Sequence, residues 1–483
     1  MVRIGFAALG YKSELSVNKT PGRNFTKPNP DLPRLMAYET LYEVTFEGGY
    51  SNLLLPKRLE KSELDTRDRS FVTELVYGTL RMQGKHDFRI AKSSARTLAQ
   101  IDPKVLLCLR LGVHQIYEMR IPDHAAVSAT VELARKVAGE SSGSFVNAVL
   151  RNMTNLIPQD SQPLDLAGQT DKNTYLANEF SHPDWIISAY LDHLKDYEKV
   201  AELLAANNIP AQPTLVAWPN FSSVSELVAG GAVAVPETKY AANFAGNPGS
   251  LSEIKSRRAG VQDYGSQLVT ELFYATSAGI TKNLRWLDMC AGPGGKSALL
   301  TALMSGREDY FLANELSKAR AELVRQVIKT GEVVSFDGRE LAANGFAKPE
   351  NAFDRILIDA PCTGLGALRR RPETRWRRSI NDLKSLMQLQ KELLHSASEI
   401  LVADGMIAYV TCSPHLNETR FQVKEFLRTH RDFQLAPIPT GIAIGKYSSA
   451  IQEDCMFQLW THTHGTDAMF LALLQRKESK VKG

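Results

Sequence analysis

Two cysteines and one aspartate stand where short apolar runs of the sequence end. Asp359 closes the run RILI, and Cys362 follows it directly after Pro361. Cys412 ends the run MIAYVT and stands just before the turn-forming Pro414. Thiolates are nucleophiles and carboxylates can hold or move protons, so these side chains would suit nucleophilic catalysis if they meet at one place. The alternative, that both cysteines only pack as small hydrophobic residues, stays open at this point.

A glycine-rich turn, DMCAGPGGKS (288–297), joins a predicted strand to a predicted helix. Glycines let a ligand approach the backbone, and a helix N-terminus offers free N–H groups. The spacing does not fit a Walker A loop, because Cys290 stands where the first glycine is required, and it does not fit the dinucleotide pattern GxGxxG. A nucleoside ligand without a pyrophosphate remains, beside the alternative that the turn only permits tight packing.

Four acidic residues end four successive apolar runs: Asp288, Glu315, Asp337 and Asp359, at intervals of 27, 22 and 22 residues. This spacing is typical of βα units in a parallel, doubly wound sheet. Because ligands bind at the carboxyl ends of such strands, the four acids and the two cysteines should line one edge of the sheet. Glu315 would then be placed to hold two ribose hydroxyls, and Asp337 to meet an adenine amino group.

An arginine-rich segment follows the Cys362 loop and contains six arginines within ten residues (369–378), together with Trp376. This composition suits a phosphate backbone and an unstacked base, so the sequence favours nucleic acid as the partner. The alternative is a charged loop that pairs with acidic residues of the middle of the chain. The net charge of +4 permits a polyanionic partner but does not demand one.

The composition is that of a globular protein of two or three domains, with 483 residues, 43% hydrophobic and 23% charged. No apolar stretch is long enough to cross a membrane, and the start of the chain does not resemble a signal peptide. The five cysteines are widely spread and form no CxxC pair, which indicates a cytosolic protein with neither a disulfide framework nor a zinc site. Cys108 and Cys455 are expected to pack as small hydrophobic residues.

The pattern of the sequence divides the chain into four segments. They are a flexible leader (1–32), a helical domain (33–160), a small mixed α+β domain (170–265) and an α/β domain (266–483). In the helical domain Asp102 is a good N-cap, Pro103 suits the first helical position, and Gly139 can end a helix.

Three motifs together resemble the RNA 5-methylcytosine methyltransferases: DMCAGPGGKS, DAPCTG followed by RRRPETRW, and YVTCSPHLNE. Upstream, LDTRDRSFVTELVYGTLR, IPDHAAVSATVELA and SFVNAVLRNM resemble a NusB-like domain. The combination is similar to the bacterial 16S rRNA methyltransferase B (Sun/Fmu) family from about residue 33 onward. One departure is Ala468, where the family usually has glycine. The resemblance implies an all-α NusB-like domain, a small α+β linker domain and a Rossmann-like methyltransferase domain.

The resemblance implies that Cys412 adds to C6 of a cytosine, so that C5 can attack the methyl group of S-adenosyl-L-methionine. Cys362 would assist product release, and Asp359 would bond the N3/N4 edge of the base, which must be unpaired or flipped out. The cofactor site would comprise Cys290, Ala291, Gly292, Pro293, Gly294, Gly295, Lys296, Glu315, Arg320, Asp337 and Asp359. Lys296 would neutralise either the cofactor carboxylate or an RNA phosphate, and the sequence does not separate these two roles.

The resulting hypothesis is a cytoplasmic, monomeric enzyme that methylates 16S rRNA and needs no metal. Three alternatives stay open: a tRNA 5-methylcytosine methyltransferase, a non-catalytic RNA-binding protein, and a Rossmann-type oxidoreductase. A decayed enzyme should have lost one of Asp359, Cys362 or Cys412, and all three are present. Equilibrium binding of S-adenosylmethionine against NAD would separate the methyltransferase from the oxidoreductase.

Overall fold

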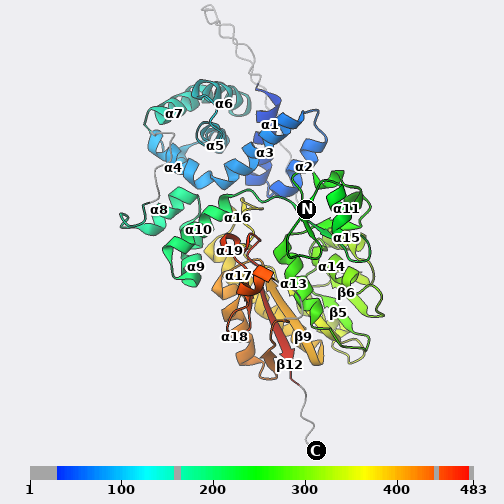
Figure 1. The fold of residues 1–483 in the computed structure, drawn as a ribbon. Helices are drawn as coiled ribbons and strands as arrows, with labels where there is room; N and C mark the ends of the chain where they lie inside the picture. The colour runs from blue at the N-terminus through cyan, green and yellow to red at the C-terminus, as the bar shows by residue number, and fades with distance from the viewer. Residues whose placement is uncertain (1–29, 157–164, 440–444, 478–483) are drawn as a thin grey trace, which may run out of the picture.

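A computed structural model describes residues 30–156, 165–439 and 445–477 (Figure 1). The predicted leader, 1–32, lies outside these residues except for its last three positions. The first helix starts at Leu32, where the Asp31 side chain accepts a hydrogen bond from the backbone of Arg34. No helix among the described residues has the length and apolar character needed to span a bilayer.

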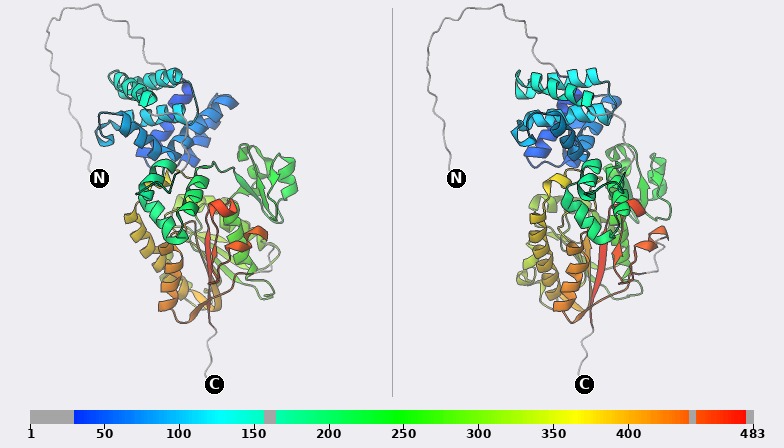
Figure 2. Two further views of the ribbon diagram at one scale, coloured as in Figure 1. Left: turned by 60° about the vertical axis from the view of Figure 1, so that its left-hand side comes forward. Right: turned by 90° about the vertical axis from the view of Figure 1, so that its left-hand side faces the viewer.

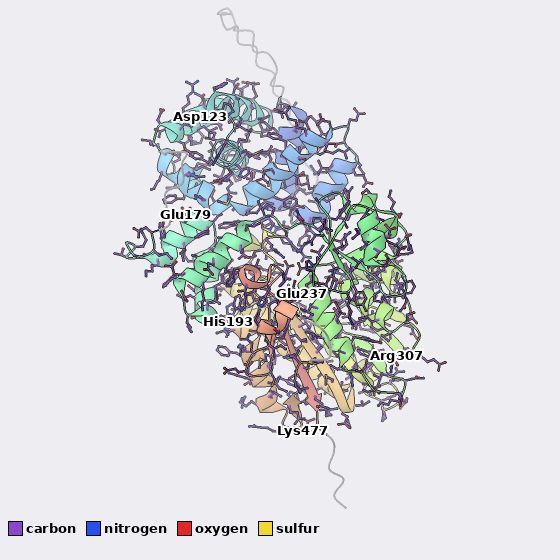
Figure 3. All side chains as sticks on the ribbon, viewed as in Figure 1. Asp123, Glu179, His193, Glu237, Arg307 and Lys477 are labelled. Atoms are coloured by element: carbon purple, nitrogen blue, oxygen red, sulfur yellow. The ribbon has the colours of Figure 1, made fainter. Side chains whose placement is uncertain are left out.

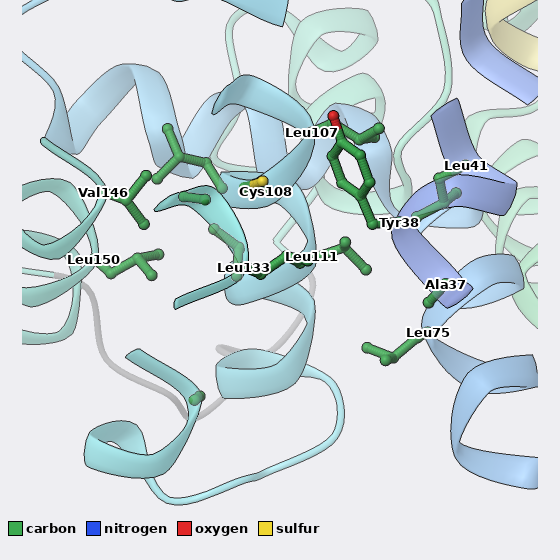
Figure 4. Packing of buried hydrophobic residues seen from close by; sticks show 14 of the residues in the cluster. Ala37, Tyr38, Leu41, Leu75, Leu107, Cys108, Leu111, Leu133, Val146 and Leu150 are labelled. Atoms are coloured by element: carbon green, nitrogen blue, oxygen red, sulfur yellow. The ribbon is translucent and has the colours of Figure 1, made fainter. Parts of the chain in front are cut away.

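The N-terminal part is helical, as predicted from the sequence. Its helices are α1 (Leu32–Phe46), α2 (Ser51–Glu60), α3 (Thr66–Arg81), α4 (Gln83–Ser93), α5 (Pro103–Tyr117), α6 (Asp123–Ala138) and α7 (Ser142–Leu156). Asp102 caps α5, Pro103 is its first residue, and Gly139 ends α6 with a φ of 92°. The helices enclose one apolar core, and Figure 4 shows Cys108 within it between Leu133 and Leu107. The prediction that Cys108 packs as a hydrophobic residue is confirmed.

The middle of the chain contains helices and strands, but they pack as two units. The first unit is α8 (Lys172–Phe180), α9 (Asp184–Leu194) and α10 (Tyr197–Asn208). It lies between the N-terminal helices and the large sheet (Figure 2). Glu179 of α8 pairs with Lys85 of the N-terminal helices at 2.7 Å. His193 of α9 donates a hydrogen bond to the carbonyl of Pro414 at 2.9 Å. Glu179 and His193 are labelled in Figure 3.

The second unit is a small antiparallel sheet with two helices. It comprises β1 (Thr214–Ala217), α11 (Val224–Ala229), β2 (Val233–Ala234), β3 (Ala241–Asn243), α12 (Ser252–Lys255) and β4 (Ala259–Val261), in the strand order β2-β3-β1-β4. One face carries Leu215 and Ala217 against α11 and α12. The other face carries Val216 and packs, with Trp218, against the helix that follows the glycine-rich turn. The predicted boundaries of a single mixed domain at 170–265 stay a prediction.

The C-terminal part is an α/β sheet of eight strands. The strands are β5 (Arg285–Asp288), β6 (Tyr310–Asn314), β7 (Glu332–Val334), β8 (Phe353–Asp359), β9 (Leu401–Thr411), β10 (Phe433–Leu435), β11 (Phe457–Gln458) and β12 (Phe470–Arg476). The order is β10-β12-β9-β8-β5-β6-β7, with β11 paired to β12. Strands β9 to β7 along this path are parallel, as predicted, whereas β12 and β10 are antiparallel additions beside β9.

Helices cover both faces of this sheet, as expected of a doubly wound fold. They are α13 (Tyr264–Ala275), α14 (Gly295–Leu303) and α15 (Lys318–Val327) on one face, and α17 (Ile380–Glu399) and α18 (Arg420–Thr429) on the other. The short helices α16 (Thr374–Arg377) and α19 (Thr461–His464) lie in the connections. Single turns of 3-10 or π helix occur at Leu98–Gln100, Pro248–Ser250, Gly338–Glu340, Ala342–Phe346, Leu416–Glu418 and Gly445–Ala450.

Candidate active site

The predicted acids and cysteines do converge at the carboxyl edge of the parallel strands. Asp288 is the last residue of β5 and Asp359 the last of β8, and these two strands are neighbours in the sheet. Glu315 follows β6 directly, and Asp337 comes three residues after β7. Cys412 follows β9, which pairs in parallel with β8, so it reaches the same edge as Cys362.

The glycine-rich turn has a backbone that requires glycine. Gly294 is the N-cap of α14 with a φ of 94°, and a Cβ there would lie 2.6 Å from the side chain of Val327. Gly292 also has a positive φ, 57°. Ala291 is fixed by a hydrogen bond from its N–H to the carbonyl of Asn314, and Pro293 is exposed at the tip of the turn. A Cβ at Gly295 would meet only Gln262, at 3.9 Å, so space remains beside the start of α14.

Glu315 is buried and is hydrogen-bonded to the glycine-rich turn. Its carboxylate accepts from the N–H of Gly292 at 2.9 Å and from the N–H of Ser317 at 3.0 Å. Arg320 lies 3.4 Å from the same carboxylate. Leu316 beside it is an apolar side chain that is 66% exposed, a feature that sequence reasoning did not single out. Turn, carboxylate and exposed apolar surface together fit a nucleoside with a polar tail, because such a ligand has a ribose, an apolar ring face and charged groups.

Lys296 is buried and pairs with Asp359 at 2.7 Å. Burial alone would lower the pKa of Lys296, but the Asp359 carboxylate outweighs burial and raises that pKa. Asp288 lies below this pair and accepts from the hydroxyl of Ser297 at 2.6 Å. Burial, aided by the nearby Asp359 charge, raises the pKa of Asp288 to about 7. The two roles expected for Lys296, toward the cofactor carboxylate or an RNA phosphate, stay predictions.

Two predicted cofactor residues lie at the margins of this site. Asp337 caps a short 3-10 turn and pairs with Arg339 at 2.6 Å, and these bonds lower the pKa of its carboxyl. Cys290 is partly buried, and burial raises the pKa of its thiol. Both lie at the predicted edge of the sheet, and their contact with a cofactor stays a prediction.

The two candidate catalytic thiols are in contact, with 3.5 Å between the sulfurs of Cys362 and Cys412. The hydrogen bond between them lowers the pKa of Cys412; burial and the Asp359 charge oppose this shift, and the charges of Arg371 and Lys296 support it. The same hydrogen bond, with burial, raises the pKa of Cys362. The pair is therefore polarised, with the thiolate favoured at Cys412.

A close backbone contact holds the loop that follows Cys362. The N–H of Gly366 donates to the carbonyl of Cys412 at 2.9 Å, and its carbonyl accepts from the N–H of Ala468 at 2.8 Å. A Cβ at Gly366 would lie 2.3 Å from the Ala468 carbonyl, so only glycine fits. Ala468 contributes only backbone groups to this contact, so its methyl side chain is compatible with it.

The prediction that the arginine-rich segment holds RNA is wrong for most of its residues. Arg369 and Arg370 form ion pairs with Asp263 and Asp467. These acids lie at the start of α13 and just before β12, so the two arginines join parts of the α/β domain. At these positions the loop does pair with acids, as the alternative expected, but only Asp263 lies toward the middle of the chain, and Asp467 lies close to β12.

The rest of the segment binds the N-terminal helices and the unit of α8, α9 and α10. Arg375 is fully buried and donates to the carbonyls of Arg81, Ser181 and Asn207 at 3.0, 3.2 and 2.9 Å, and to the side-chain oxygen of Asn208 at 2.8 Å. These oxygens lie at the C-terminal ends of α3, α8 and α10, where helix dipoles favour a cation. The Arg375 guanidinium thus joins the ends of α3, α8 and α10 to the catalytic loop, the segment from Cys362 to Arg378.

Further contacts of the same kind surround Arg375. The Trp376 indole donates to the carbonyl of Leu80, and Arg377 bonds the carbonyls of Val44 and Gly49. Glu373, also buried, accepts from the N–H and hydroxyl of Ser51, the first residue of α2. A cavity of about 380 Å³ lies beside these contacts, between α16 and the N-terminal helices, and away from the cysteine pair.

Two residues of the segment remain near solvent. Arg371 is exposed, and Arg378 makes only a 3.9 Å contact with Asp382. Cys455 is also exposed, so the prediction that it packs in a core is wrong.

Comparisons with known proteins connect this site to a family. A family model described as 16S rRNA methyltransferase RsmB/F matches residues 279–475, and a NusB family model matches residues 31–155. A Mycobacterium tuberculosis protein named only as a methyltransferase is 40% identical over 92% of this chain and 97% of its own length. The ribosomal RNA small subunit methyltransferase B of Pseudomonas putida is 30% identical over 82% of this chain and 88% of its own.

Two solved structures share the fold. The crystal structure of PH0851 superposes with a TM-score of 0.74 at 20% identity, covering 93% of this chain and 100% of its own. NSun6 from Pyrococcus horikoshii, solved with SFG, has a TM-score of 0.51 at 15% identity, covering 62% of this chain and 99% of its own. At these identities the likeness concerns the fold alone.

Proposed function

The chain belongs to the RsmB/F family of 16S rRNA methyltransferases with a NusB-like N-terminal domain, and on this premise we propose that it methylates C5 of a cytosine in 16S rRNA. The coarser activity follows from membership: the enzyme transfers a methyl group from a cofactor of the S-adenosylmethionine type to ribosomal RNA. The position on the base, the covalent mechanism and the choice of 16S rRNA as the target are our proposal.

The observation that carries the proposal is the contact between Cys362 and Cys412 beside Asp359. Two thiols 3.5 Å apart, at the strand edge that also holds the glycine-rich turn, can reach the same small ring. Methyl transfer to an oxygen or to an exocyclic nitrogen needs no protein nucleophile, because these atoms already have lone pairs. Carbon C5 of cytosine lacks one, and a thiol adduct at the neighbouring C6 supplies the missing electron density.

The proposed reaction assigns one role to each side chain. The Cys412 thiolate adds to C6, which forms an S–C6 bond and makes C5 nucleophilic. C5 takes the methyl group that S-adenosylmethionine supplies, the C5 proton leaves to a base, and the S–C6 bond then breaks. Asp359 holds the N3/N4 edge of the base with N3 protonated, and Cys362 assists the last step. The target base must be unstacked to reach this edge.

The cofactor would be held by the glycine-rich turn and the acids at the strand ends. The backbone of Ala291–Lys296 would lie against its amino-acid end, Glu315 would bind its ribose, and Asp337 its adenine edge, with Leu316 against the ring face. Lys296 would keep Asp359 oriented toward the base through their 2.7 Å ion pair. We also propose that the enzyme is cytoplasmic and acts on 16S rRNA as a monomer.

Two cysteine variants test this function. Deproteinised 16S rRNA is incubated with each variant and S-adenosylmethionine, and products are separated by denaturing electrophoresis. Cys412→Ala should transfer no methyl and form no adduct, because the attacking thiol is absent. Cys362→Ala should still attack but release slowly, so RNA should remain bonded to the protein.

Mapping of 5-methylcytosine in the wild-type product identifies the target base. An adduct with Cys412→Ala and none with Cys362→Ala would reverse the two roles. Full activity in both variants, without any adduct, would contradict covalent catalysis. Wild-type transfer to tRNA but not to 16S rRNA would replace the proposed substrate.

A further inference from the structure

A buried acid lies directly beneath the cysteine pair and is not explained by the roles given so far. Glu418 ends the 3-10 turn Leu416–Glu418 and is fully buried. Among the described residues it forms no ion pair with a lysine, arginine or histidine. An isolated carboxylate in an apolar interior costs several kcal/mol unless hydrogen bonds satisfy it, so its position calls for a reason.

The bonds of Glu418 go to the residue after Cys362. Its carboxylate accepts from the backbone N–H of Thr363 at 2.8 Å and, through the other oxygen, from the Thr363 hydroxyl. The Thr363 hydroxyl lies 3.1 Å from that of Ser413, the residue after Cys412. A single buried carboxylate therefore ties together the two chain segments that carry the catalytic thiols.

Gln390 of α17 completes this arrangement from the other side. Its amide donates to the carbonyl of Pro361 at 2.8 Å and to Glu418 at 3.2 Å, so both neighbours of Cys362 are held. Tyr409 donates to the backbone carbonyl of Glu418 at 2.8 Å. Glu418, Gln390, Tyr409, Thr363 and Ser413 are each at most 1% exposed. Such a satisfied, buried network fixes a single geometry more firmly than apolar packing does.

We propose that Glu418 is a positioning residue that sets the placement of the Cys362 sulfur against the Cys412 sulfur. The proposal rests on the function proposed above, in which both thiols act on one base. Strand pairing brings β8 and β9 together, but both thiols lie beyond the paired residues, where the sheet no longer fixes the chain. The clamp, a chain of hydrogen bonds from Glu418 through Thr363 to Ser413, constrains the two segments there, in addition to the backbone bond between Gly366 and Cys412.

The charge of Glu418 adds a second effect on the same pair. It contributes, after the hydrogen bond to Cys412 and burial, to raising the pKa of Cys362. The positive charges of Arg371 and Lys296 act on Cys412 instead. The Glu418 charge thus helps to keep Cys362 a thiol, whereas Cys412 ionises more readily. The proposed reaction requires this difference between the two cysteines.

The test compares Glu418→Ala with Glu418→Gln. Glutamine keeps an acceptor for the Thr363 N–H and can donate its amide to the Thr363 hydroxyl, so it should restore the clamp that alanine removes. Gln422→Ala is a matched control, because Gln422 is a buried polar residue nearby whose side chain bonds Met387 and neither cysteine segment. Titration with S-adenosylmethionine reports whether each variant is folded.

The decisive measurement uses a bifunctional bimane that fluoresces only after both arms have alkylated thiols. Wild type, Glu418→Gln and Gln422→Ala should give the bridged signal, and Glu418→Ala should fall to the level of Cys362→Ala. In rRNA methylation Glu418→Ala should lose about 100-fold in kcat, the cost of a misplacement near 1 Å, with KM for RNA unchanged. If Glu418→Ala does not fold, Thr363→Val, which removes the hydroxyl between Glu418 and Ser413, should show the same loss of bridging.

Bridging and kcat at the wild-type level in Glu418→Ala would overturn the proposal. Equal loss of kcat in the alanine and glutamine variants with bridging intact would also overturn it, since charge and not position would then matter. The bridging assay contains no RNA. If the wild type bridges as described but methylates no rRNA, the proposed function fails while the positioning role of Glu418 stands.

Discussion

Replacing Arg375 by methionine should loosen the catalytic loop from the N-terminal helices. Methionine keeps the length of the side chain but none of its donors, so four oxygens lose their partner. Hydrogen bonds to a charged group contribute about 1.5–3 kcal/mol each, about 6–12 kcal/mol for four. Burying the guanidinium costs several kcal/mol of this, and burial lowers the pKa of Arg375 to about 9. We therefore expect a net loss of about 3–5 kcal/mol.

Hydrogen exchange of the α16 amides measures this loss locally, which suits a chain of several domains better than global unfolding. The N–H groups of Trp376 and Arg377 both bond the carbonyl of Glu373, and their exchange requires α16 to open. A loss of 3–5 kcal/mol should speed this exchange by about two to four orders of magnitude.

Arg378→Met is the matched control within the same segment, because Arg378 makes only a loose, half-exposed contact with Asp382. Its α16 exchange should equal that of the wild type. Arg375→Lys should fall between the two, since an ammonium keeps the charge but cannot reach four oxygens in a fork. Unchanged α16 exchange in Arg375→Met would refute the reasoning and show that the three helix ends do not depend on the guanidinium.

Three further predictions concern the cofactor edge and the N-terminal domain. Glu315→Ala should weaken S-adenosylmethionine binding by about 1.5–3 kcal/mol, because a charged hydrogen-bond partner is lost; unchanged affinity by calorimetry in a folded variant would exclude its proposed role. The pKa of Asp288 in the folded state is about 7, above its ordinary value. The protonated carboxyl therefore contributes its full share to the free energy of unfolding below pH 4, and this contribution is lost as the pH rises through 7. Between pH 4 and pH 8 the free energy of unfolding of Asp288→Asn should therefore rise by about 3–5 kcal/mol relative to that of the wild type. Equal pH profiles of the two proteins in urea unfolding would contradict this. A chain starting near residue 170 should keep cofactor binding but lose rRNA affinity, and methylation of rRNA at the full-length rate would disprove the targeting role of the NusB-like domain.

The chemistry-bearing residues were predictable because strand ends follow a simple rule. Apolar runs that stop at Asp288, Asp359 or Cys412 identify parallel strands, and the carboxyl ends of such strands meet at one edge. The sequence alone therefore placed Cys362 and Cys412 together, and the structure has their sulfurs in contact. The helical N-terminal part was predictable for a similar reason, since its caps at Asp102 and Gly139 are local.

The arginine-rich segment was misjudged because its partners are distant in the sequence and many of them are neutral backbone carbonyls. Composition indicates a cation but not what neutralises it, and Arg375 uses backbone carbonyls that no residue type reveals. Glu418 was missed for the converse reason. The only signal was an acid six residues after Cys412, in a loop that looks exposed from sequence but is buried by α17. The antiparallel strand β10 escaped notice because it has only three residues.

The convergence of three helix ends on Arg375 also sets an order of events during synthesis of the chain. Arg375 follows Arg81 by 294 positions and Asn208 by 167. At translation rates of about 5–20 residues per second, α3 waits roughly 15–60 s for the side chain that completes its end. The NusB-like helices have their own core and can fold on emergence, but their orientation is fixed only when the ribosome has passed Cys362. The enzyme thus joins its N-terminal domain to the catalytic loop late, as one of its last folding steps.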